Sequence, residues 1–146
     1  MTNPVKTHLH GTDAVGQVIR RGRCPNVFSA LAEWFAPLER RAKASGEEIR
    51  VVLEGTTHSR AMRQLLVRYA EEAELEMSVD VLHARKLRII TESVAKCDAL
   101  DAAVLNQLAR SNLTLPTCYM PDDEVFALRE HLRARSDLVR MRLPVV

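Results

Sequence analysis

Two aspartates and one glutamate are the residues whose types and positions best fit a chemical role. Asp98 and Asp101 stand three apart, ahead of an apolar run that begins at Val104. Residues three apart share one face of a helix, so both carboxylates can point at one metal ion. Glu54 directly follows the β-rich run 51–53, at the end of a strand where α/β sheets bind their ligands. Three carboxylates can hold Mg²⁺ or Mn²⁺, which activates the nucleophile in phosphodiester cleavage.

Each of these acids also has a simpler, structural interpretation. Asp98 is a preferred helix N-cap, and Asp101 would then be the third helical residue in a near capping-box pattern. The helix dipole favours negative charge at this position by roughly 0.3–1 kcal/mol. Glu54 can equally point at water beside the polar turn at 55–59. The spacing of the two aspartates, taken alone, favours capping over metal binding.

The pattern along the chain predicts strands that alternate with helices. Turn residues at 11–16 indicate that the first two strands form a hairpin. In the first helix, Pro37 is expected to cause a break or kink, and Ser45-Gly46 is expected to end the helix. This order predicts an α/β sheet that is partly parallel after the hairpin, in one domain with a helical tail. The expected strands are 6–10, 17–23, 49–53 and 75–81. The first expected helix begins at an Asn26 cap, and the second follows the turn at 55–59, capped by Thr56, Thr57 or Ser59. Three further helices are expected over 83–91, 98–110 and about 122–142.

Composition excludes several classes of protein. At 146 residues, 47% hydrophobic and 27% charged, the chain suits one globular domain. No apolar run approaches the ~20 residues of a membrane span, so no membrane partner is expected. Three scattered cysteines favour a reducing cytoplasm over a disulfide framework. The net charge of +2 does not require nucleic acid, and the arginine-rich clusters at 20–23 and 85–88 are interpreted as solvated faces.

Four segments, taken in order, are similar to one family of enzymes. Gly16–Asn26 looks like a strand and the turn into a first helix, and Val51–Thr56 looks like a strand that ends in a catalytic Glu. Lys96–Leu105 matches the signature Lys-x-Asp-x-x-Asp-Ala-x-x-Leu, and Pro121–Arg142 looks like the start of a long helix. Over residues 13–142 the sequence therefore resembles the N-terminal part of the DEDD transposases of bacterial insertion sequences, the group that contains the Piv invertase.

This resemblance implies a fold, a site and an activity. The family's catalytic domain is RuvC-like, with a ribonuclease-H-like mixed sheet flanked by helices. That implies an α/β domain over residues 1–120 and the start of a long helical segment over 121–146. The resemblance assigns Glu54, Asp98 and Asp101 to three of four catalytic, metal-binding acids, with Mg²⁺ or Mn²⁺ as cofactor. The implied function is metal-dependent cleavage and exchange of DNA strands in DNA transposition.

The family's first acid has no counterpart in the sequence. It is an Asp near the start of a first strand, upstream of the glycine that matches Gly16, whereas here no acid precedes Asp13. Asp13 falls in the hairpin turn, where we expect a surface residue. His8 and His10 lie on the neighbouring strand, but imidazole suits Mg²⁺ poorly. The family also continues into a coiled coil and a second domain. We therefore expect a fragment that is truncated at both ends, binds metal weakly and has little independent recombinase activity.

The partners that the resemblance implies are DNA, a structured guide RNA and a second copy of the chain, in a bacterial cytoplasm. The second copy would bind through the last helix, where Val125, Leu128, Leu132 and Val139 form an apolar seam, although packing of this seam on the core is favoured. Two alternatives to a transposase domain stay open. One is a non-catalytic module that dimerises or binds nucleic acid, and the other is an unrelated α/β regulatory domain whose acids only cap helices.

Overall fold

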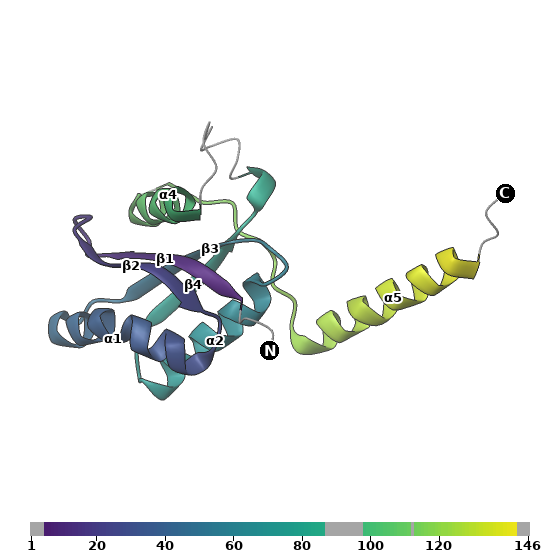
Figure 1. The fold of residues 1–146 in the computed structure, drawn as a ribbon, viewed down its shortest axis with the longest axis horizontal. Helices are drawn as coiled ribbons and strands as arrows, with labels where there is room; N and C mark the ends of the chain where they lie inside the picture. The colour runs from purple at the N-terminus through teal and green to yellow at the C-terminus, as the bar shows by residue number, and fades with distance from the viewer. Residues whose placement is uncertain (1–4, 87–97, 112, 143–146) are drawn as a thin grey trace.

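The computed structural model describes residues 5–86, 98–111 and 113–142, and for residues 98–100 it describes the backbone only. Strands form a layer with α4 on one side and α1 and α2 on the other (Figure 1). The helix expected over 83–91 falls largely outside the described residues. The elements in chain order are β1 (Lys6–Thr12), β2 (Val18–Pro25), α1 (Phe28–Ser45), β3 (Ile49–Glu54), α2 (Ser59–Glu72), β4 (Met77–Leu82), α4 (Asp98–Arg110) and α5 (Asp123–Arg142).

The strands pair as a hairpin and as a parallel pair. β1 runs antiparallel to β2, with a register shift at Gly11/Thr12, and β3 runs parallel to β4. Both pairings confirm the mixed α/β class and the opening hairpin. Within the described ranges, however, the strands form two separate two-stranded sheets in place of the expected single mixed sheet. The reason is that β1 and β3 face each other across a cleft and do not pair.

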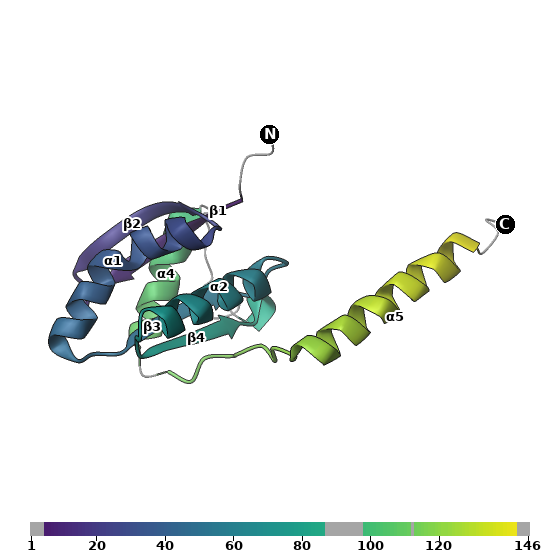
Figure 2. The same ribbon diagram turned by 90° about the horizontal axis from the view of Figure 1, so that it is seen from below.

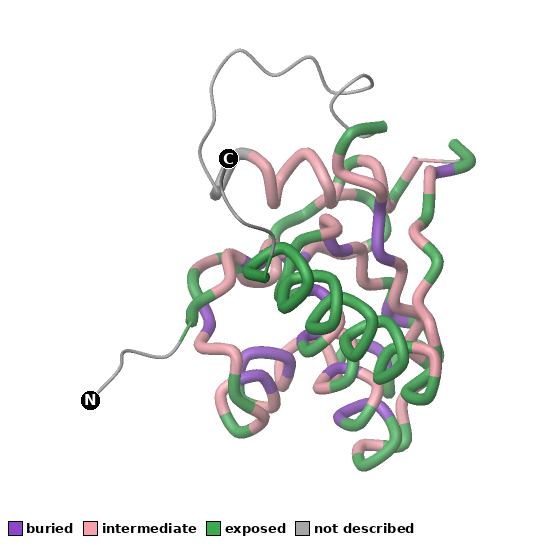
Figure 3. Tube along the Cα trace, turned by 90° about the vertical axis from the view of Figure 1, so that its right-hand side faces the viewer, coloured by how far each residue is buried: buried purple, intermediate pink, exposed green. Residues whose placement is uncertain are grey.

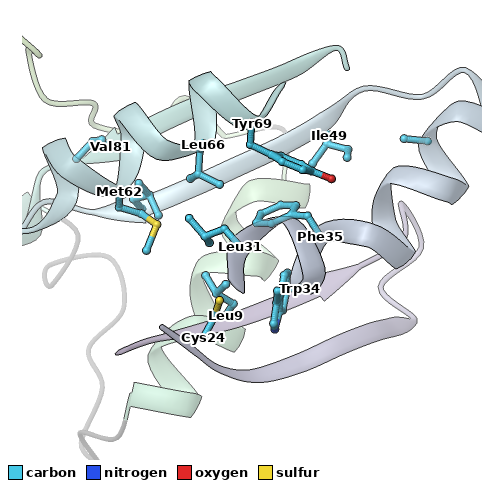
Figure 4. Packing of buried hydrophobic residues seen from close by; sticks show 12 residues of the cluster. Leu9, Cys24, Leu31, Trp34, Phe35, Ile49, Met62, Leu66, Tyr69 and Val81 are labelled. Carbon is cyan, nitrogen blue, oxygen red and sulfur yellow. The ribbon is translucent and has the colours of Figure 1, made fainter. Parts of the chain in front are cut away.

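The core lies where α1 packs between the hairpin and α2. Leu31, Trp34 and Phe35 recur at helical spacing and are at most 5% exposed. Figure 4 shows Trp34 next to Leu9 of β1, whereas Leu31 and Phe35 point toward Leu66 and its neighbours on α2. Aromatic residues make up only 4% of the chain, so their clustering here concentrates the largest buried side chains at one place.

Three local expectations are wrong in detail. Asn26 does not cap α1: the N-cap is Val27, with no side-chain cap hydrogen bond, because the Asn26 amide oxygen accepts the Thr7 hydroxyl of β1 instead. Pro37 lies inside a continuous α1, whose burial against the core outweighs the lost backbone hydrogen bond. The N-cap of α2 is His58, and the hydroxyls around it bond within the turn. The predicted stop is confirmed, because Gly46 adopts φ 71° and donates its N–H to Ala42.

α5 projects away from the rest of the molecule (Figure 2). None of its 20 residues is buried, and Figure 3 shows it exposed along most of its length. Core packing of its apolar seam was the wrong expectation: Leu128 is 60% and Leu132 54% exposed. The seam fails to pack because residues 113–122 lead the helix outward, and α5 contacts the body near its first turns through Arg60 and Tyr119. Among the described helices, none is long and apolar enough to cross a membrane.

Candidate metal and nucleic-acid site

A cleft of about 690 Å³ lies between the two sheets. All of β1 and all of β3 line it, together with parts of α1 and α4. The outer strands contribute little: β4 supplies no lining residue in the described structure, and β2 supplies Ile19. The cleft therefore lies between the two inner strands, β1 and β3. From α4 the lining residues are Asp101, Ala102, Leu105, Asn106, Ala109 and Arg110.

Alternation along β3 decides which wall of the cleft Glu54 occupies. Ile49 and Leu53 are buried in the main core with α1 and α2. Val52 instead packs in a second cluster with Leu105 of α4. Because successive side chains in a strand point to opposite faces, Glu54 shares the α4 side with Val52.

The contacts of α4 fix the direction of its acidic end. Asn106 donates to the carbonyl of His10, near the end of β1, at 3.0 Å. Arg50, near the start of β3, donates to the carbonyl of Ala109 at 2.9 Å. The last turns of α4 therefore touch the end of β1 and the start of β3, so these two strands run in opposite directions. The first turn of α4, with Asp101, consequently lies toward the end of β3 that carries Glu54.

The three predicted acids are thus described to different extents. Glu54 and Asp101 both line the cleft, on the α4 side. Asp98 begins α4, and its side chain lies outside the described part of the chain. Among the described residues, no group of three or more His, Cys, Asp or Glu side chains has the geometry of a metal site. Two hard carboxylate donors on one wall fit Mg²⁺ or Mn²⁺ as a partial ligand set.

Histidines from two elements line the same cleft. His8 and His10 belong to β1, and His58 precedes α2. Burial, reinforced by the charges of Arg21 and Arg110, lowers the pKa of His10 below its usual value. His10 therefore stays neutral at pH 7 and can accept or donate one hydrogen bond without adding charge to the cleft.

Asp13 lies at the opposite end of the cleft from Glu54. Its carboxylate accepts the N–H groups of Val15 and Gln17 and pairs with Arg41 at 3.4 Å. Only 11% of the Asp13 side chain is exposed, so the expectation of a surface residue was wrong. These contacts close the hairpin turn, so Asp13 has a structural role and does not stand in for a fourth metal ligand near Glu54.

Comparison with known families identifies the chain. A family model for DEDD transposases of the IS110 type, described as a transposase, matches residues 5–145. The chain belongs to this transposase family. A search of curated proteins finds no match. Family membership rules out the alternative of an unrelated α/β regulatory domain, and it implies a role in DNA transposition, DNA binding and use of a divalent metal ion.

The sequence interpretation missed two residues that build the cleft of this transposase domain. Asn106 connects α4 to β1, since its amide oxygen also accepts the Thr12 hydroxyl at 2.9 Å. Arg50 connects α4 to the start of β3 and pairs with Asp80 of β4 at 3.6 Å. A polar residue on the otherwise apolar face formed by Ala102, Leu105 and Ala109 was the available signal for Asn106. For Arg50, a charge inside a β-rich run was the signal.

One member of the first arginine cluster, Arg20, packs against α1 and is not a freely solvated side chain. Arg20 donates to the carbonyl of Glu33 at 2.9 Å and lies over the Trp34 ring, 5.9 Å from its centroid. It therefore connects β2 to α1. In the second cluster, Arg85 and Lys86 are exposed, and Arg88 lies outside the described residues.

Proposed function

We propose that the chain is a ribonuclease-H-like domain of a DNA transposase in which Glu54, Asp98 and Asp101 hold a divalent metal ion against a DNA phosphodiester. The domain spans residues 1–120, with 121–146 beginning a long helical segment. The observation that carries the proposal is that Glu54 and Asp101 reach one cleft from two elements far apart in sequence, on the same wall. Helix capping accounts for Asp98 and Asp101 but gives no reason for Glu54 to share a cleft with Asp101.

The carboxylates and His10 have different roles in the proposed site. When bound, Mg²⁺ or Mn²⁺ supplies a Lewis acid that polarises the phosphate and lowers the pKa of an attacking water. The three carboxylates bind the cation and offset their mutual repulsion by doing so. His10 lines the same cleft, and its neutral imidazole can donate or accept one hydrogen bond to orient a polar group there.

A Mn²⁺ titration of the purified chain tests the ligand assignment. We expect Glu54→Gln, Asp98→Asn and Asp101→Asn each to weaken Mn²⁺ binding at least tenfold, since each removes a hard anionic donor. Glu48→Gln is the matched control, because Glu48 is an exposed acid that lines the same cleft at the other end of β3. If the three variants bind Mn²⁺ like the control, the metal assignment is wrong.

Nucleic-acid binding is tested separately from the metal. A duplex DNA probe and a structured RNA probe, each measured by anisotropy from 50 to 300 mM salt, should bind with a steep salt dependence if phosphate contacts dominate. Binding by the unmodified chain that gives no cleavage when Mn²⁺ is added would favour the non-catalytic nucleic-acid-binding alternative. No binding of either probe at 50 mM salt would count against both functions.

The exposed helix α5 supports a second, compatible role in self-association. Its apolar seam has the spacing of a helix–helix interface and consists of Val125, Leu128, Leu132 and Val139. None of these four residues is buried against the core. We propose that two copies of the chain pair through this seam, which removes the exposed apolar surface from water.

Sedimentation equilibrium tests the pairing of α5. Leu132→Glu places a charge in the seam and should shift a concentration-dependent dimer to monomer. Arg133→Glu is the control, because Arg133 is an exposed neighbour whose side chain pairs with Glu130 outside the seam. A chain that is monomeric at every concentration, or a dimer insensitive to Leu132→Glu, contradicts the proposal.

A further inference from the structure

The two faces of the β1–β2 hairpin differ in charge. On one face, Leu9 and Cys24 are buried in the core beside Leu31 of α1 (Figure 4). Because side chains alternate along a strand, the neighbours of these residues in the chain point to the opposite face, toward α4. The strand register places five basic side chains on this second face: Lys6, His8 and His10 of β1, and Arg21 and Arg23 of β2.

The hairpin itself supplies no acid to balance this charge. Neither β1 nor β2 contains an Asp or a Glu. An acid directly across from a basic residue would give a stabilising cross-strand pair, whereas here the register sets a histidine opposite each of the two arginines. The turn at 13–17 contains one acid, Asp13, and its carboxylate pairs with Arg41. The hairpin therefore concentrates positive charge on this face.

α4 adds a further guanidinium group at the turn end of the same face. A Cβ placed on Gly16 would lie 2.6 Å from Arg110 Nη1, so the Arg110 side chain rests against the hairpin turn. Burial lowers the pKa of His10, and the charges of Arg21 and Arg110 lower this pKa further. The guanidinium groups of Arg21 and Arg110 therefore converge on one histidine, although they come from elements far apart in the sequence.

The three arginines of this face are accessible to a partner. Arg21, Arg23 and Arg110 are all exposed. α4 packs on β1 and β3, whereas α1 packs on β2 from the opposite side (Figure 1). Within the described residues none of the three pairs with an acid, in contrast to the exposed Arg68 and Arg133. An exposed guanidinium group without an acidic partner can bind a phosphate through two parallel hydrogen bonds.

The cations form a row that begins beside the acidic end of the cleft. Because β1 and β3 run in opposite directions, Lys6 at the start of β1 lies toward the end of β3 that carries Glu54. From there Arg23, Arg21 and Arg110 follow in this order toward the hairpin turn. Alternate residues of a strand stand about 7 Å apart, since a strand rises about 3.4 Å per residue. The row can therefore follow a line of phosphates that leads to the proposed metal site.

We propose that this basic face, defined by Lys6, Arg21, Arg23 and Arg110, binds the phosphate backbone of duplex DNA and directs one strand toward the end of the cleft that holds Glu54. The identity of the ligand as DNA rests on the proposed transposase function. Surfaces that bind single strands add aromatic side chains on which the bases stack, whereas β1 and β2 contain no Phe, Tyr or Trp. Contacts to the backbone alone position a duplex without reading its sequence.

Binding of duplex DNA in the presence of EDTA tests the proposal without a contribution from bound metal. Anisotropy is measured on the full chain from about 50 to about 300 mM salt. Arg21→Gln/Arg23→Gln should bind at least tenfold more weakly than the parent chain at the lowest salt. The slope of log affinity against log salt should decrease by about 2, because each phosphate contact contributes about 0.9 to it. The control Arg40→Gln/Arg133→Gln removes the same charge from exposed positions on α1 and α5 and should keep the slope.

A charge-preserving variant separates phosphate binding from a defect in folding. Arg21→Lys/Arg23→Lys should restore the salt slope, since lysine also neutralises a phosphate. Equal losses in the glutamine variant and the control, no restoration by lysine, or no binding of the parent chain to DNA at the lowest salt overturns the proposal. A structured RNA that binds through the same arginines at least tenfold more tightly than DNA would show that DNA is the wrong ligand.

The Mn²⁺ titration distinguishes failure of this proposal from failure of the metal assignment. Arg21→Gln/Arg23→Gln should keep the Mn²⁺ affinity of the parent chain, because neither arginine is a metal ligand. Asp101→Asn should in turn keep the DNA affinity that the parent chain has in EDTA. A loss of Mn²⁺ affinity in the arginine variant equal to that in Asp101→Asn would mean that the hairpin substitutions disturb the cleft, and the separate DNA-binding role would be wrong.

Discussion

Asn106 connects α4 to β1, and its removal is expected to loosen the helix that carries Asp101. Its side-chain amide donates to the His10 carbonyl at 3.0 Å, and its oxygen accepts from the Thr12 hydroxyl at 2.9 Å and from Arg110 Nε at 3.1 Å. The contacts with His10 and Thr12 are partly buried, while that with Arg110 is exposed. We therefore expect the first two contacts to dominate the stability that Asn106 contributes.

The size of the effect follows from these contacts. Two neutral hydrogen bonds contribute about 1 kcal/mol each, and an unpaired carbonyl left in the cleft costs about 1 kcal/mol more. The higher helix propensity of alanine offsets roughly 0.7 kcal/mol of this loss. Asn106→Ala should therefore lower the free energy of unfolding by about 2 kcal/mol. For a domain of this size, that corresponds to a decrease in Tm of roughly 8 °C.

Urea denaturation at pH 7 measures the change, with Gln107→Ala as the matched control. Gln107 is the exposed neighbour of Asn106 on α4, so its replacement changes helix propensity without breaking a contact to β1. A loss in Asn106→Ala no larger than in Gln107→Ala would refute the role assigned to Asn106. A double-mutant cycle with Thr12→Val should recover about 1 kcal/mol of coupling, because the two side chains share one hydrogen bond.

Three further predictions concern the core, a titrating pair and a helix end. Leu66→Ala should cost about 2–5 kcal/mol in urea unfolding because Leu66 is 0% exposed, whereas Leu113→Ala, at an exposed position outside α5, should stay within about 0.5 kcal/mol. The hydrogen bond from Tyr69 is the largest cause that lowers the pKa of Glu39. The ionised Glu39 therefore stabilises the fold fully above its unfolded pKa of about 4.3. This stabilisation is lost as the pH falls through the lower pKa that Glu39 has in the folded chain. In Tyr69→Phe, the free energy of unfolding should therefore decrease less between pH 7 and pH 3. If the urea midpoints of Tyr69→Phe fall as steeply over this range as those of the parent chain, the role assigned to the Tyr69–Glu39 hydrogen bond is wrong. Gly46→Ala should cost about 1 kcal/mol in the same assay, since φ is 71° and no atom lies near enough to clash, and an unchanged midpoint would mean that the left-handed conformation is not required.

Local patterns were sufficient for most of the elements. The helical spacing of Leu31, Trp34 and Phe35 defines the buried face of α1, and the β-rich run that ends at Glu54 defines β3. Gly46 ends α1 as predicted because only glycine adopts a positive φ without strain. These features depend on neighbours within a few residues, which is why periodicity and turn chemistry identify them.

The candidate site depended on both levels. The residue types and spacing of Asp98 and Asp101, with Glu54 at a strand end, were sufficient to nominate acids for a metal. Capping and binding could not be separated from the sequence, because both need the same spacing at a helix start. The tertiary structure added that Glu54 and Asp101 line one wall of one cleft, because β3 alternation and the contacts of Asn106 orient both toward it.

The sequence by itself determined the order of elements, the hairpin, the parallel pair and the signature around Asp101. Only the tertiary structure decided that β1 and β3 stay apart and that the α5 seam remains exposed. Strand pairing between β1 and β3 is a contact between segments nearly 40 residues apart along the chain, and its absence has no local signature. Whether an amphipathic helix packs on its own core likewise depends on where the preceding segment leads it. The physical reason is the same in both cases: periodicity specifies which face of an element is apolar, but the partner of that face is set by the whole fold.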